Sequence, residues 1–234
     1  EGRKGVLRRP AGGGRGTGGA GRWAGGGGGG GNDAPELMLG YWGRADATTE
    51  ILRDGWLYTG DLGYVDQDRF LYVLGREKSL LISNDGEKYS PEGIEETLCA
   101  EGEFIDQIML YNNQSPYTVA LIVPNQANIL RALQKSGLST ATEEGGRAAI
   151  ALIEGAINQY RTGKHAGDFP SKWLPATFAI LGEGFTEQNS FLNSTLKMVR
   201  GRITEFYKNR LDYMYTPEGK DVYNQQNLTI VGRF

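Results

Sequence analysis

The chain has 234 residues, enough for one or two modest domains, and its 25 Lys and Arg against 28 Asp and Glu give a net charge of −3. Residues 1–31 hold 16 of the 36 glycines and carry a net charge of +5, from six Lys and Arg against Glu1, which leaves −8 for residues 32–234. This acidic body argues against a nucleic-acid partner, because binding a polyanion requires clustered cations.

The glycine-rich segment 1–31 has too few apolar side chains to offset the conformational entropy lost on folding, so we predict an irregular, disordered tail. Three origins stay open for it. A nucleic-acid-binding arm would need repeated Arg-Gly-Gly triplets with aromatic residues, whereas this segment has a single Trp and no such triplet. The others are a flexible linker and a stretch foreign to the ancestral protein. We expect ordered structure to begin near Asn32.

The next predicted elements are short. Residues 45–53 mix acidic and apolar positions and predict a short helix. Residues 63–66 and 69–74 predict two strands around an Asp-Gln-Asp turn, because β-branched and aromatic residues flank polar turn formers. Residues 80–82 (LLI) predict a further short strand.

A helix with a clear start signal follows. Ser90 can cap free backbone N–H groups, Pro91 suits the first helical position, and Glu92 and Glu95 lie near the positive end of the helix dipole. Cys99 falls in the apolar pattern of this helix, and we interpret it as a small core residue rather than a nucleophile. Because it is the only cysteine, an internal disulfide is excluded.

The second half of the chain mixes strands and helices. Residues 105–111 and 117–123 predict a β-hairpin, and the remaining predicted elements are helices at 125–136, 143–160 and 197–213 and a strand at 177–181. This mixture predicts a compact α+β domain over about residues 77–215. The single histidine, His165, falls in a loop without a second histidine or a cysteine nearby, so we predict no metal site.

No apolar run approaches the roughly 20 residues that a membrane span needs, and no signal-peptide pattern opens the chain. We therefore predict a soluble, cytoplasmic protein without a transmembrane segment, and peripheral contact with a membrane stays open.

Three stretches form a combination that is more specific than any of them alone. They are residues 55–63 (GWLYTGDLG), 75–95 (GREKSLLISNDGEKYSPEGIE) and 192–197 (LNSTLK). With the upstream residues 37–42 (LMLGYW), their order and spacing resemble the C-terminal third of the adenylate-forming (AMP-binding) superfamily, which includes acyl-CoA synthetases, luciferases and peptide-synthetase adenylation domains. The resemblance covers about residues 36–215.

Within that superfamily the chain most resembles bacterial long-chain fatty-acid–CoA ligases. Residues 84–95 resemble their loop next to the hinge, and residues 169–175 (FPSKWLP) resemble the segment before their last strand. Their final motif usually reads Leu-Thr-Pro-Thr-Leu-Lys, whereas Asn193 and Ser194 replace Thr-Pro here. Since proline fixes φ, we expect this loop to be less rigid than in the family.

The resemblance implies that the chain takes part in activating a carboxylate with ATP. The family joins a carboxylate to the α-phosphate as an acyl-adenylate, and CoA then accepts the acyl group. Lys197 matches the family's catalytic lysine, whose charge would offset the repulsion between the carboxylate and the phosphate. On sequence alone, a solvent-facing lysine is the alternative.

The resemblance also implies nucleotide contacts. Asp61 matches the aspartate that accepts the ribose hydroxyls, Arg76 matches the arginine near the ribose and phosphates, and Tyr58 and Thr59 belong to the same nucleotide-binding motif. The alternatives are a turn aspartate bonded to backbone for Asp61 and a surface salt bridge for Arg76.

Lys78 matches the family's hinge, about which the C-terminal domain would swing between two poses. One pose would present Lys197 for adenylate formation. The other would present a CoA-side loop, with Gly86, Glu87 and Lys88, to the CoA thiol. Gly86 would permit a close backbone approach or a positive φ, and an ordinary turn glycine is the alternative.

The implied domain order is an irregular tail (1–31), the β-structured end of the large AMP-binding domain (32–75), a hinge (76–78), a small C-terminal lid domain with a central sheet and hairpin flanked by helices (79–215), and a C-terminal extension (216–234). The family's phosphate loop, adenine pocket and acyl tunnel would lie upstream of Leu37. The tail glycines lack the preceding strand and the hydroxyl or lysine residues of a phosphate loop. We therefore expect the chain alone to be inactive.

The resemblance thus implies that the chain is the C-terminal part of an ATP-dependent long-chain fatty acid:CoA ligase. Its partners in the intact enzyme would be fatty acid, ATP, Mg²⁺ and CoA, with no nucleic acid. Two alternatives stay open: transfer of the acyl group to a carrier protein, and a catalytically silent module that docks on a carrier or on a partner's large domain.

Overall fold

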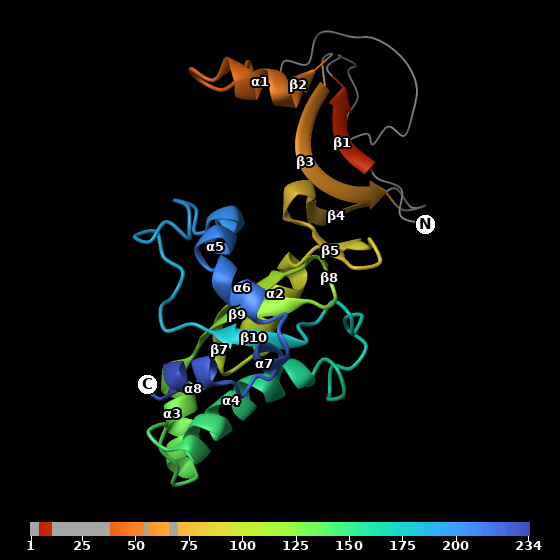
Figure 1. Cartoon of the computed structure of the whole chain (residues 1–234). Helices are drawn as coiled ribbons and strands as arrows, with labels where there is room; N and C mark the ends of the chain where they lie inside the picture. Colours follow the sequence, from red (N-terminus) through yellow and green to blue (C-terminus); the bar gives the residue numbers. More distant parts are fainter. Residues whose placement is uncertain (1–4, 11–37, 54–55, 66–69) are drawn as a thin grey trace. The chain divides into compact units, whose positions relative to one another are not determined.

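A computed structural model describes residues 5–10, 38–53, 56–65 and 70–234 (Figure 1). The chain divides into two units, Glu1–Leu80 and Leu81–Phe234. Each unit has β-sheet and helix of its own, which confirms the predicted α+β class.

In the first unit, β3 (Trp56–Val65) pairs antiparallel with three other strands. These are β1 (Gly5–Pro10), the short β2 (Leu52–Arg53) and β4 (Leu71–Arg76). Helix α1 (Ala45–Ile51) precedes β2, and the 3₁₀ turn η1 (Glu77–Ser79) follows β4. The helix and the two strands predicted for this region are confirmed, while the predicted turn between the strands lies outside the described residues.

Strand β1 differs from the predicted irregular tail. Its residues (GVLRRP) pair with β3, with Val6 opposite Leu62 and Arg9 opposite Leu57. Val and Leu favour extended backbone, and Pro10, which lacks an N–H donor, is the last residue of the strand. The prediction was therefore wrong for Gly5–Pro10, and the rest of the predicted tail lies outside the described residues.

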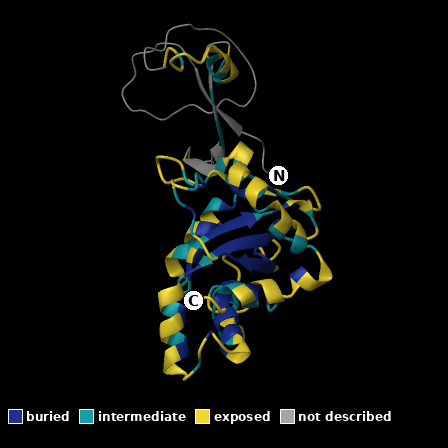
Figure 2. Cartoon of the chain, turned by 60° about the vertical axis from the view of Figure 1, so that its left-hand side comes forward, coloured by how far each residue is buried: buried dark blue, intermediate teal, exposed yellow. Residues whose placement is uncertain are grey.

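The second unit is built on a three-stranded sheet with the order β10–β9–β7. Strands β7 (Ile105–Tyr111) and β9 (Val119–Pro124) are antiparallel and confirm the predicted hairpin, and β10 (Thr177–Ile180) joins β9 in parallel. The strands are buried on both faces, as Figure 2 shows, so their sequences are nearly continuous apolar runs. Because side chains alternate along a strand, Ile108 and Leu110 belong to one hydrophobic cluster and Met109 to the other.

Helices contribute to both clusters. The first contains side chains from α2 (Glu92–Glu101), α3 (Gln126–Lys135), α4 (Glu143–Asn158) and α8 (Gln225–Val231), and the second contains side chains from α5 (Arg200–Phe206) and α6 (Lys208–Tyr213). Side chains cap two of the longer helices. Asn125 accepts the N–H of Asn128 at 2.9 Å, and Thr142 accepts that of Gly145 at 3.1 Å.

A second, smaller sheet has the order β6–β5–β8. Its strands are β5 (Leu81–Ser83), β6 (Lys88–Tyr89) and β8 (Asn113–Ser115). Strand β5 confirms the short strand predicted at residues 80–82. The connection from β5 to β6 is the predicted CoA-side loop, so the small sheet fixes both ends of that loop.

Two predicted details of the helices are wrong. No side-chain hydrogen bond caps the start of helix α2, so the cap predicted at Ser90 is wrong. Pro91 has helical φ and ψ (−76° and −24°) at the start of the helix, as expected, and its carbonyl accepts the N–H of Glu95 at 2.9 Å. The single helix predicted at 197–213 begins only at Arg200 and is interrupted at Tyr207 (φ −94°, ψ 17°). The residues before Arg200 form a turn instead.

The predicted C-terminal extension forms α7 (Pro217–Lys220) and α8, and it packs into the same core. Val231 is completely buried in the cluster that contains Ile150. The buried Asn227 accepts the N–H of Ile180 at 2.9 Å and donates to the carbonyl of Phe178 at 3.0 Å, so its amide pairs with the edge of β10.

Cys99 packs partly buried against the core, as predicted, and burial raises the pKa of its thiol to about 11. His165 lies in a turn after α4, as predicted, with its two ring nitrogens 3.3 Å from carboxylate oxygens of Glu101 and Asp168.

Candidate functional site

The residues predicted to contact the nucleotide lie on β3 and β4. Asp61 and Arg76 are directly opposite each other in the antiparallel register, and Asp61 Oδ1 lies 3.1 Å from Arg76 Nε. The Asp61 side chain is 28% exposed and that of Arg76 is 62% exposed. The residue before Asp61, Gly60, has a φ of +73°. This register therefore sets a carboxylate and a guanidinium side by side at an accessible position.

Tyr58 and Thr59 precede this pair in β3. The guanidinium carbon of Arg53, in β2, lies 5.1 Å from the centre of the Tyr58 ring, a cation–π contact. The first unit thus places all four predicted nucleotide residues on the neighbouring antiparallel strands β3 and β4.

The predicted hinge residue Lys78 lies in η1, immediately after β4. Its side chain is 90% exposed, and Nζ lies 3.4 Å from Glu50 Oε1 in α1. An exposed pair of this kind contributes only about 0.2–1 kcal/mol. The ion pair therefore contributes little to holding Lys78, and the division between the two units falls two residues later, after Leu80.

The predicted CoA-side loop folds back between β5 and β6. The N–H of Gly86 donates to the Ser83 carbonyl and the N–H of Ser83 donates to the Glu87 carbonyl, both at 2.9 Å. Gly86 has a φ of +82°, and a Cβ there would meet no atom within 4 Å. The expected positive φ is confirmed, and the glycine is required by backbone conformation rather than by lack of space.

Two carboxylates of this loop share one ammonium. Lys172 Nζ lies 3.0 Å from Asp85 Oδ2 and 2.5 Å from Glu87 Oε2. The Ser83 hydroxyl and Lys172 hold the pKa of Asp85 far below its usual range, and Lys172 and the Trp173 indole lower the pKa of Glu87. Both carboxylates therefore stay charged at neutral pH, while Lys88 is an exposed residue of β6.

Lys197 lies at the end of a tight, exposed turn between β10 and α5. The carbonyl oxygen of the Asn193 side chain accepts the backbone N–H of Thr195 at 3.0 Å, the hydroxyl of Thr195 at 2.8 Å and the backbone N–H of Lys197 at 2.9 Å. Leu196 has a φ of +58°, which costs a leucine about 1–3 kcal/mol and persists only when its surroundings enforce it. Asn193 supplies that constraint, so a side chain holds the turn where the family has a proline.

A buried ion pair fixes the residues that follow this turn. Arg200, the first residue of α5, pairs with Glu95 of α2, and Arg200 Nη1 donates to the Leu110 carbonyl at 3.3 Å. The other oxygen of Glu95 accepts the Leu110 N–H at 2.6 Å. Glu95 is only 4% exposed; burial raises its pKa and Arg200 opposes that rise. Glu95 thus lies in the first turn of α2, as predicted, and is also a buried partner of α5 and β7.

The predicted site residues fall into separate groups in the structure. Asp61, Arg76, Tyr58 and Thr59 lie on adjacent strands of the first unit, while the CoA-side loop and Lys197 belong to the second. The residues that sequence reasoning missed are those that hold the loops: Lys172, Trp173, Asn193 and Arg200. A signal existed for Lys172 and Trp173, which lie within the family-like stretch 169–175.

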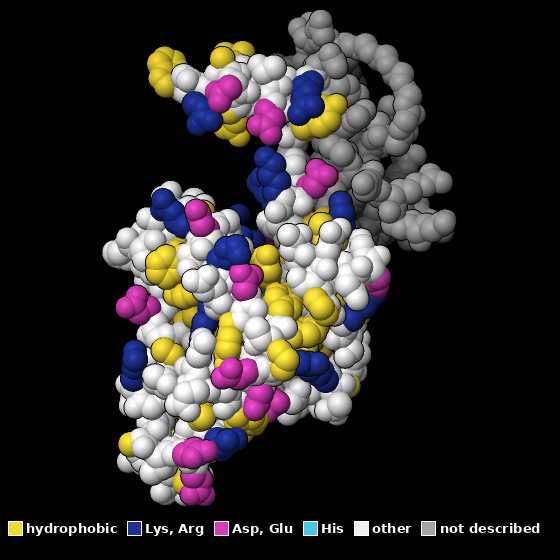
Figure 3. All heavy atoms as spheres, in the orientation of Figure 1, with side chains coloured by type: hydrophobic (Ala, Val, Ile, Leu, Met, Phe, Trp, Pro, Cys, Tyr) yellow, Lys and Arg dark blue, Asp and Glu magenta, His cyan; other side chains and the backbone are white. Residues whose placement is uncertain are grey.

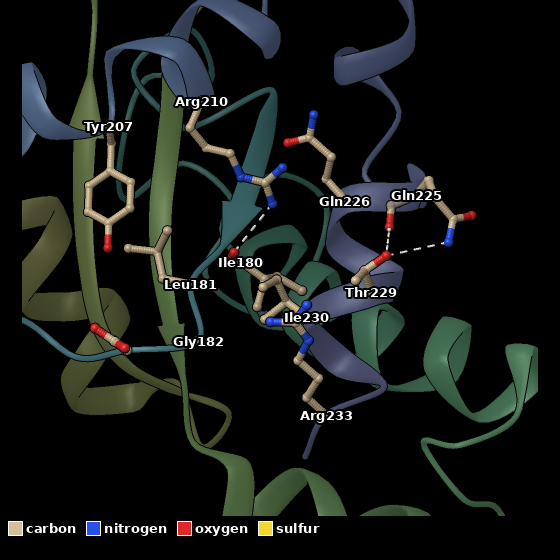
Figure 4. A pocket seen from close by; sticks show the side chains of 11 residues that line it. Ile180, Leu181, Gly182, Tyr207, Arg210, Gln225, Gln226, Thr229, Ile230 and Arg233 are labelled. Carbon is tan, nitrogen blue, oxygen red and sulfur yellow. Dashed lines mark hydrogen bonds between the residues drawn. The ribbon is translucent and has the colours of Figure 1, made fainter.

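One hollow in the second unit lies away from these groups. A cavity of about 510 Å³ lies between the end of β10 and helices α6 and α8 (Figure 4), and its lining includes Tyr207, Arg210, Thr229 and Arg233. Arg210 donates to the Ile180 carbonyl at 3.4 Å and to Asn227 Oδ1 at 3.0 Å. Since its guanidinium is already used to tie α6 to α8, we interpret this cavity as a gap in helix packing.

The surface of the second unit carries charges of both signs. On the face shown in Figure 3, basic and acidic side chains are interspersed over the second unit. Among the described residues, no group of three or more His, Cys, Asp or Glu is placed to hold a metal ion. Within the same ranges, no helix combines the length and the apolar character needed to cross a membrane.

Curated proteins of known activity resemble the chain in sequence, although no family model matches it. The chain is 31% identical over 186 residues to Long-chain-fatty-acid–CoA ligase FadD15 of Mycobacterium tuberculosis, covering 78% of this chain and 30% of that protein. It is 29% identical over 200 residues to human Long-chain-fatty-acid–CoA ligase ACSBG1, covering 76% of this chain and 27% of that protein. The chain thus spans less than a third of the length of these relatives.

A solved structure shares the fold. The adenylation domain of a carboxylate reductase from Mycobacterium chelonae matches 76% of this chain and 26% of its own, with a TM-score of 0.63 and 24% sequence identity. At that identity the match supports the fold alone.

Proposed function

We propose that this chain, which belongs to the adenylate-forming family of enzymes, is the C-terminal catalytic part of an ATP-dependent long-chain fatty acid:CoA ligase. The observation that carries the proposal is the presentation of Lys197. It lies on an exposed turn that Asn193 fixes from within, and the buried Arg200–Glu95 pair anchors the residues that follow. Such an arrangement delivers an ammonium group to a bound substrate in a defined geometry.

In the first step, a carboxylate oxygen of the fatty acid attacks the α-phosphorus of ATP, and the bond to pyrophosphate breaks. Two anions approach each other, so a positioned cation lowers the barrier. Lys197 supplies that cation, and Asp61 and Arg76 hold the ribose and phosphates. Mg²⁺ would enter with the phosphates of ATP; the described residues offer no acidic cluster for it, so no step is routed through a metal bound by this chain.

In the second step, the sulfur of CoA attacks the carbonyl carbon of the acyl-adenylate, the thioester forms and AMP leaves. The loop with Gly86, Glu87 and Lys88 serves this step. Lys78 is the hinge that exchanges the Lys197 turn for this loop. Its exposed side chain and its place just before Leu81, where the second unit begins, support that role.

The test separates the two steps in the intact protein that contains this segment. Lys197→Ala should slow pyrophosphate release with fatty acid and ATP by about 10²–10³-fold, the usual effect of removing one positioned charge-stabilising group. It should leave thioester formation from synthetic acyl-adenylate nearly unchanged. Lys135→Ala, at an exposed lysine in the last turn of α3, is the matched control and should change neither step. Equal slowing of both steps by Lys197→Ala would contradict the proposed division of labour.

A further inference from the structure

The segment that links α4 to β10 contacts the CoA-side loop from far away in the sequence. Lys172 meets Asp85 and Glu87 with its ammonium group, at 3.0 Å and 2.5 Å. The next residue, Trp173, donates its indole N–H to the Glu87 carboxylate at 3.2 Å. Two consecutive side chains therefore provide three contacts to a loop more than 80 residues earlier in the chain.

The loop depends on these contacts for charge balance. The Ser83 hydroxyl donates to Asp85 Oδ1, and the N–H of Glu87 donates to the same oxygen at 3.1 Å. Asp85 and Glu87 are thereby held on the same side of the loop, where two carboxylates repel each other. Lys172 lies within ion-pair distance of both carboxylates, so its positive charge offsets their repulsion and links the two side chains.

Lys172 and Trp173 are themselves held by the sheets. The Trp173 ring stacks on the buried Tyr89 ring with centroids 5.1 Å apart and an angle of 3° between the planes. The Tyr89 hydroxyl lies 2.5 Å from Thr118 Oγ1, and the Thr118 hydroxyl donates to the Lys172 carbonyl at 3.2 Å. The backbone of Lys172 and the ring of Trp173 thus also contact residues outside the loop, Thr118 in β9's N-terminal flank and Tyr89 in β6.

We propose that Lys172 and Trp173 are positioning residues that hold residues 83–88 in the conformation required for thioester formation. This positioning role rests on the proposed function. The role goes beyond that function because it assigns the conformation of the CoA-side loop to side chains from a different segment of the chain. Lys172 and Trp173 act through the loop, so the adenylation step does not depend on them.

The first test uses the full 234-residue chain and measures amide hydrogen exchange in the loop. Lys172→Met should speed amide hydrogen exchange in residues 83–88 by about two- to fivefold, which corresponds to the worth of an exposed ion pair. Lys172→Arg should restore slow exchange, because a guanidinium can bridge the same two carboxylates. Trp173→Phe keeps the stacked ring and removes only the indole donor, so it should have a smaller effect. Unchanged exchange in Lys172→Met would overturn the proposal.

A matched control is available in Lys208→Met. Lys208 pairs with Asp212 at 2.6 Å on the surface of α6, so the variant removes an exposed ion pair that does not contact the loop. Exchange at residues 83–88 should stay at the wild-type rate in this variant. An equal acceleration in both variants would show a general effect of charge and would also overturn the proposal.

The second test uses the intact protein and the two half-reactions. The double substitution Lys172→Met/Trp173→Phe should slow thioester formation from synthetic acyl-adenylate by roughly tenfold or more, as misplaced groups do. Pyrophosphate release should be unchanged. If both steps slow equally or neither slows, the positioning role in thioester formation fails while the proposed function stands. If the wild-type protein forms no acyl-adenylate, the proposed function fails and the positioning role in thioester formation fails with it. Hydrogen exchange still decides whether Lys172 orders the loop.

Discussion

Replacing Arg200 with methionine should destabilise the second unit by about 3 kcal/mol. Glu95 would lose the partner of one carboxylate oxygen while remaining almost fully buried, with only the Leu110 N–H on its other oxygen. Removing one member of a buried ion pair typically costs about 3–5 kcal/mol. The lower end applies here because the Arg200 side chain is 19% exposed, so some water can reach that side of the carboxylate.

The loss should also depend on pH in a definite direction. Burial already raises the pKa of Glu95, and without Arg200 the hydrogen bond from the Leu110 N–H is left to oppose that rise. A carboxyl group whose folded pKa exceeds its unfolded value binds a proton more readily in the folded state. The penalty is therefore fully present above the folded pKa, and it falls as pH drops toward the unfolded value of about 4.3. Arg200→Met should thus lose more stability at pH 8 than at pH 5.

Urea unfolding followed by helical circular dichroism is the assay, because the long helices lie in the second unit. Lys208→Met removes an exposed i,i+4 pair with Asp212 and is the matched control, with only a small expected loss because exposed pairs contribute little. Glu95→Gln in the Arg200→Met background removes the buried charge and keeps an acceptor for Leu110, so it should recover most of the loss. An Arg200→Met variant within about 1 kcal/mol of wild type at pH 8 would refute the buried-pair reasoning.

Two further predictions concern activity and the CoA-side loop. The purified chain, given ATP, Mg²⁺ and palmitate, should release no pyrophosphate above background, and turnover of about 1 s⁻¹ or more would contradict the need for further sequence. The indole N–H resonance of Trp173, assigned with Trp173→Phe, should shift between pH 6 and pH 2 with a midpoint below the ordinary glutamate value of about 4.3, because Lys172 and Trp173 lower the pKa of Glu87. The stabilisation that Glu87 provides is present above its unfolded pKa and lost as pH falls through the lower folded pKa, so a midpoint above 5 would be inconsistent with the contact.

Patterns within short stretches of sequence predicted the helices, strands and turns whose formation depends mainly on neighbouring residues. The period of apolar residues in Glu143–Asn158 and the turn formers between β7 and β9 are readable without any partner. The positive φ of Gly86 followed from its residue type in a polar loop. In each case the information lies within a few residues of the element that it specifies.

The failures have the opposite origin. Strand β1 forms only because β3 supplies its hydrogen-bond partners from about 50 residues later. Glu95 lies in the first turn of α2, as predicted, but its burial was not predicted, and only its contact with Arg200, 105 residues away, explains it. The Asn193 side chain holds the turn before Lys197 through three hydrogen bonds, a support that the sequence did not reveal, and the lower rigidity expected from the lost proline stays a prediction. Contacts between distant residues decide these features, and a single sequence does not list them.

The amide of Asn227 gives the last nineteen residues of the chain a role in solubility. Strand β10 lies at the edge of its sheet, where unpaired N–H and carbonyl groups can recruit a strand from another molecule and begin aggregation. Asn227 occupies the N–H of Ile180 and the carbonyl of Phe178, as a neighbouring strand would. An expression fragment that stopped at Tyr215, where the family resemblance ends, would keep every recognisable motif and uncover this edge. Recombinant versions of the second unit should therefore extend to Phe234.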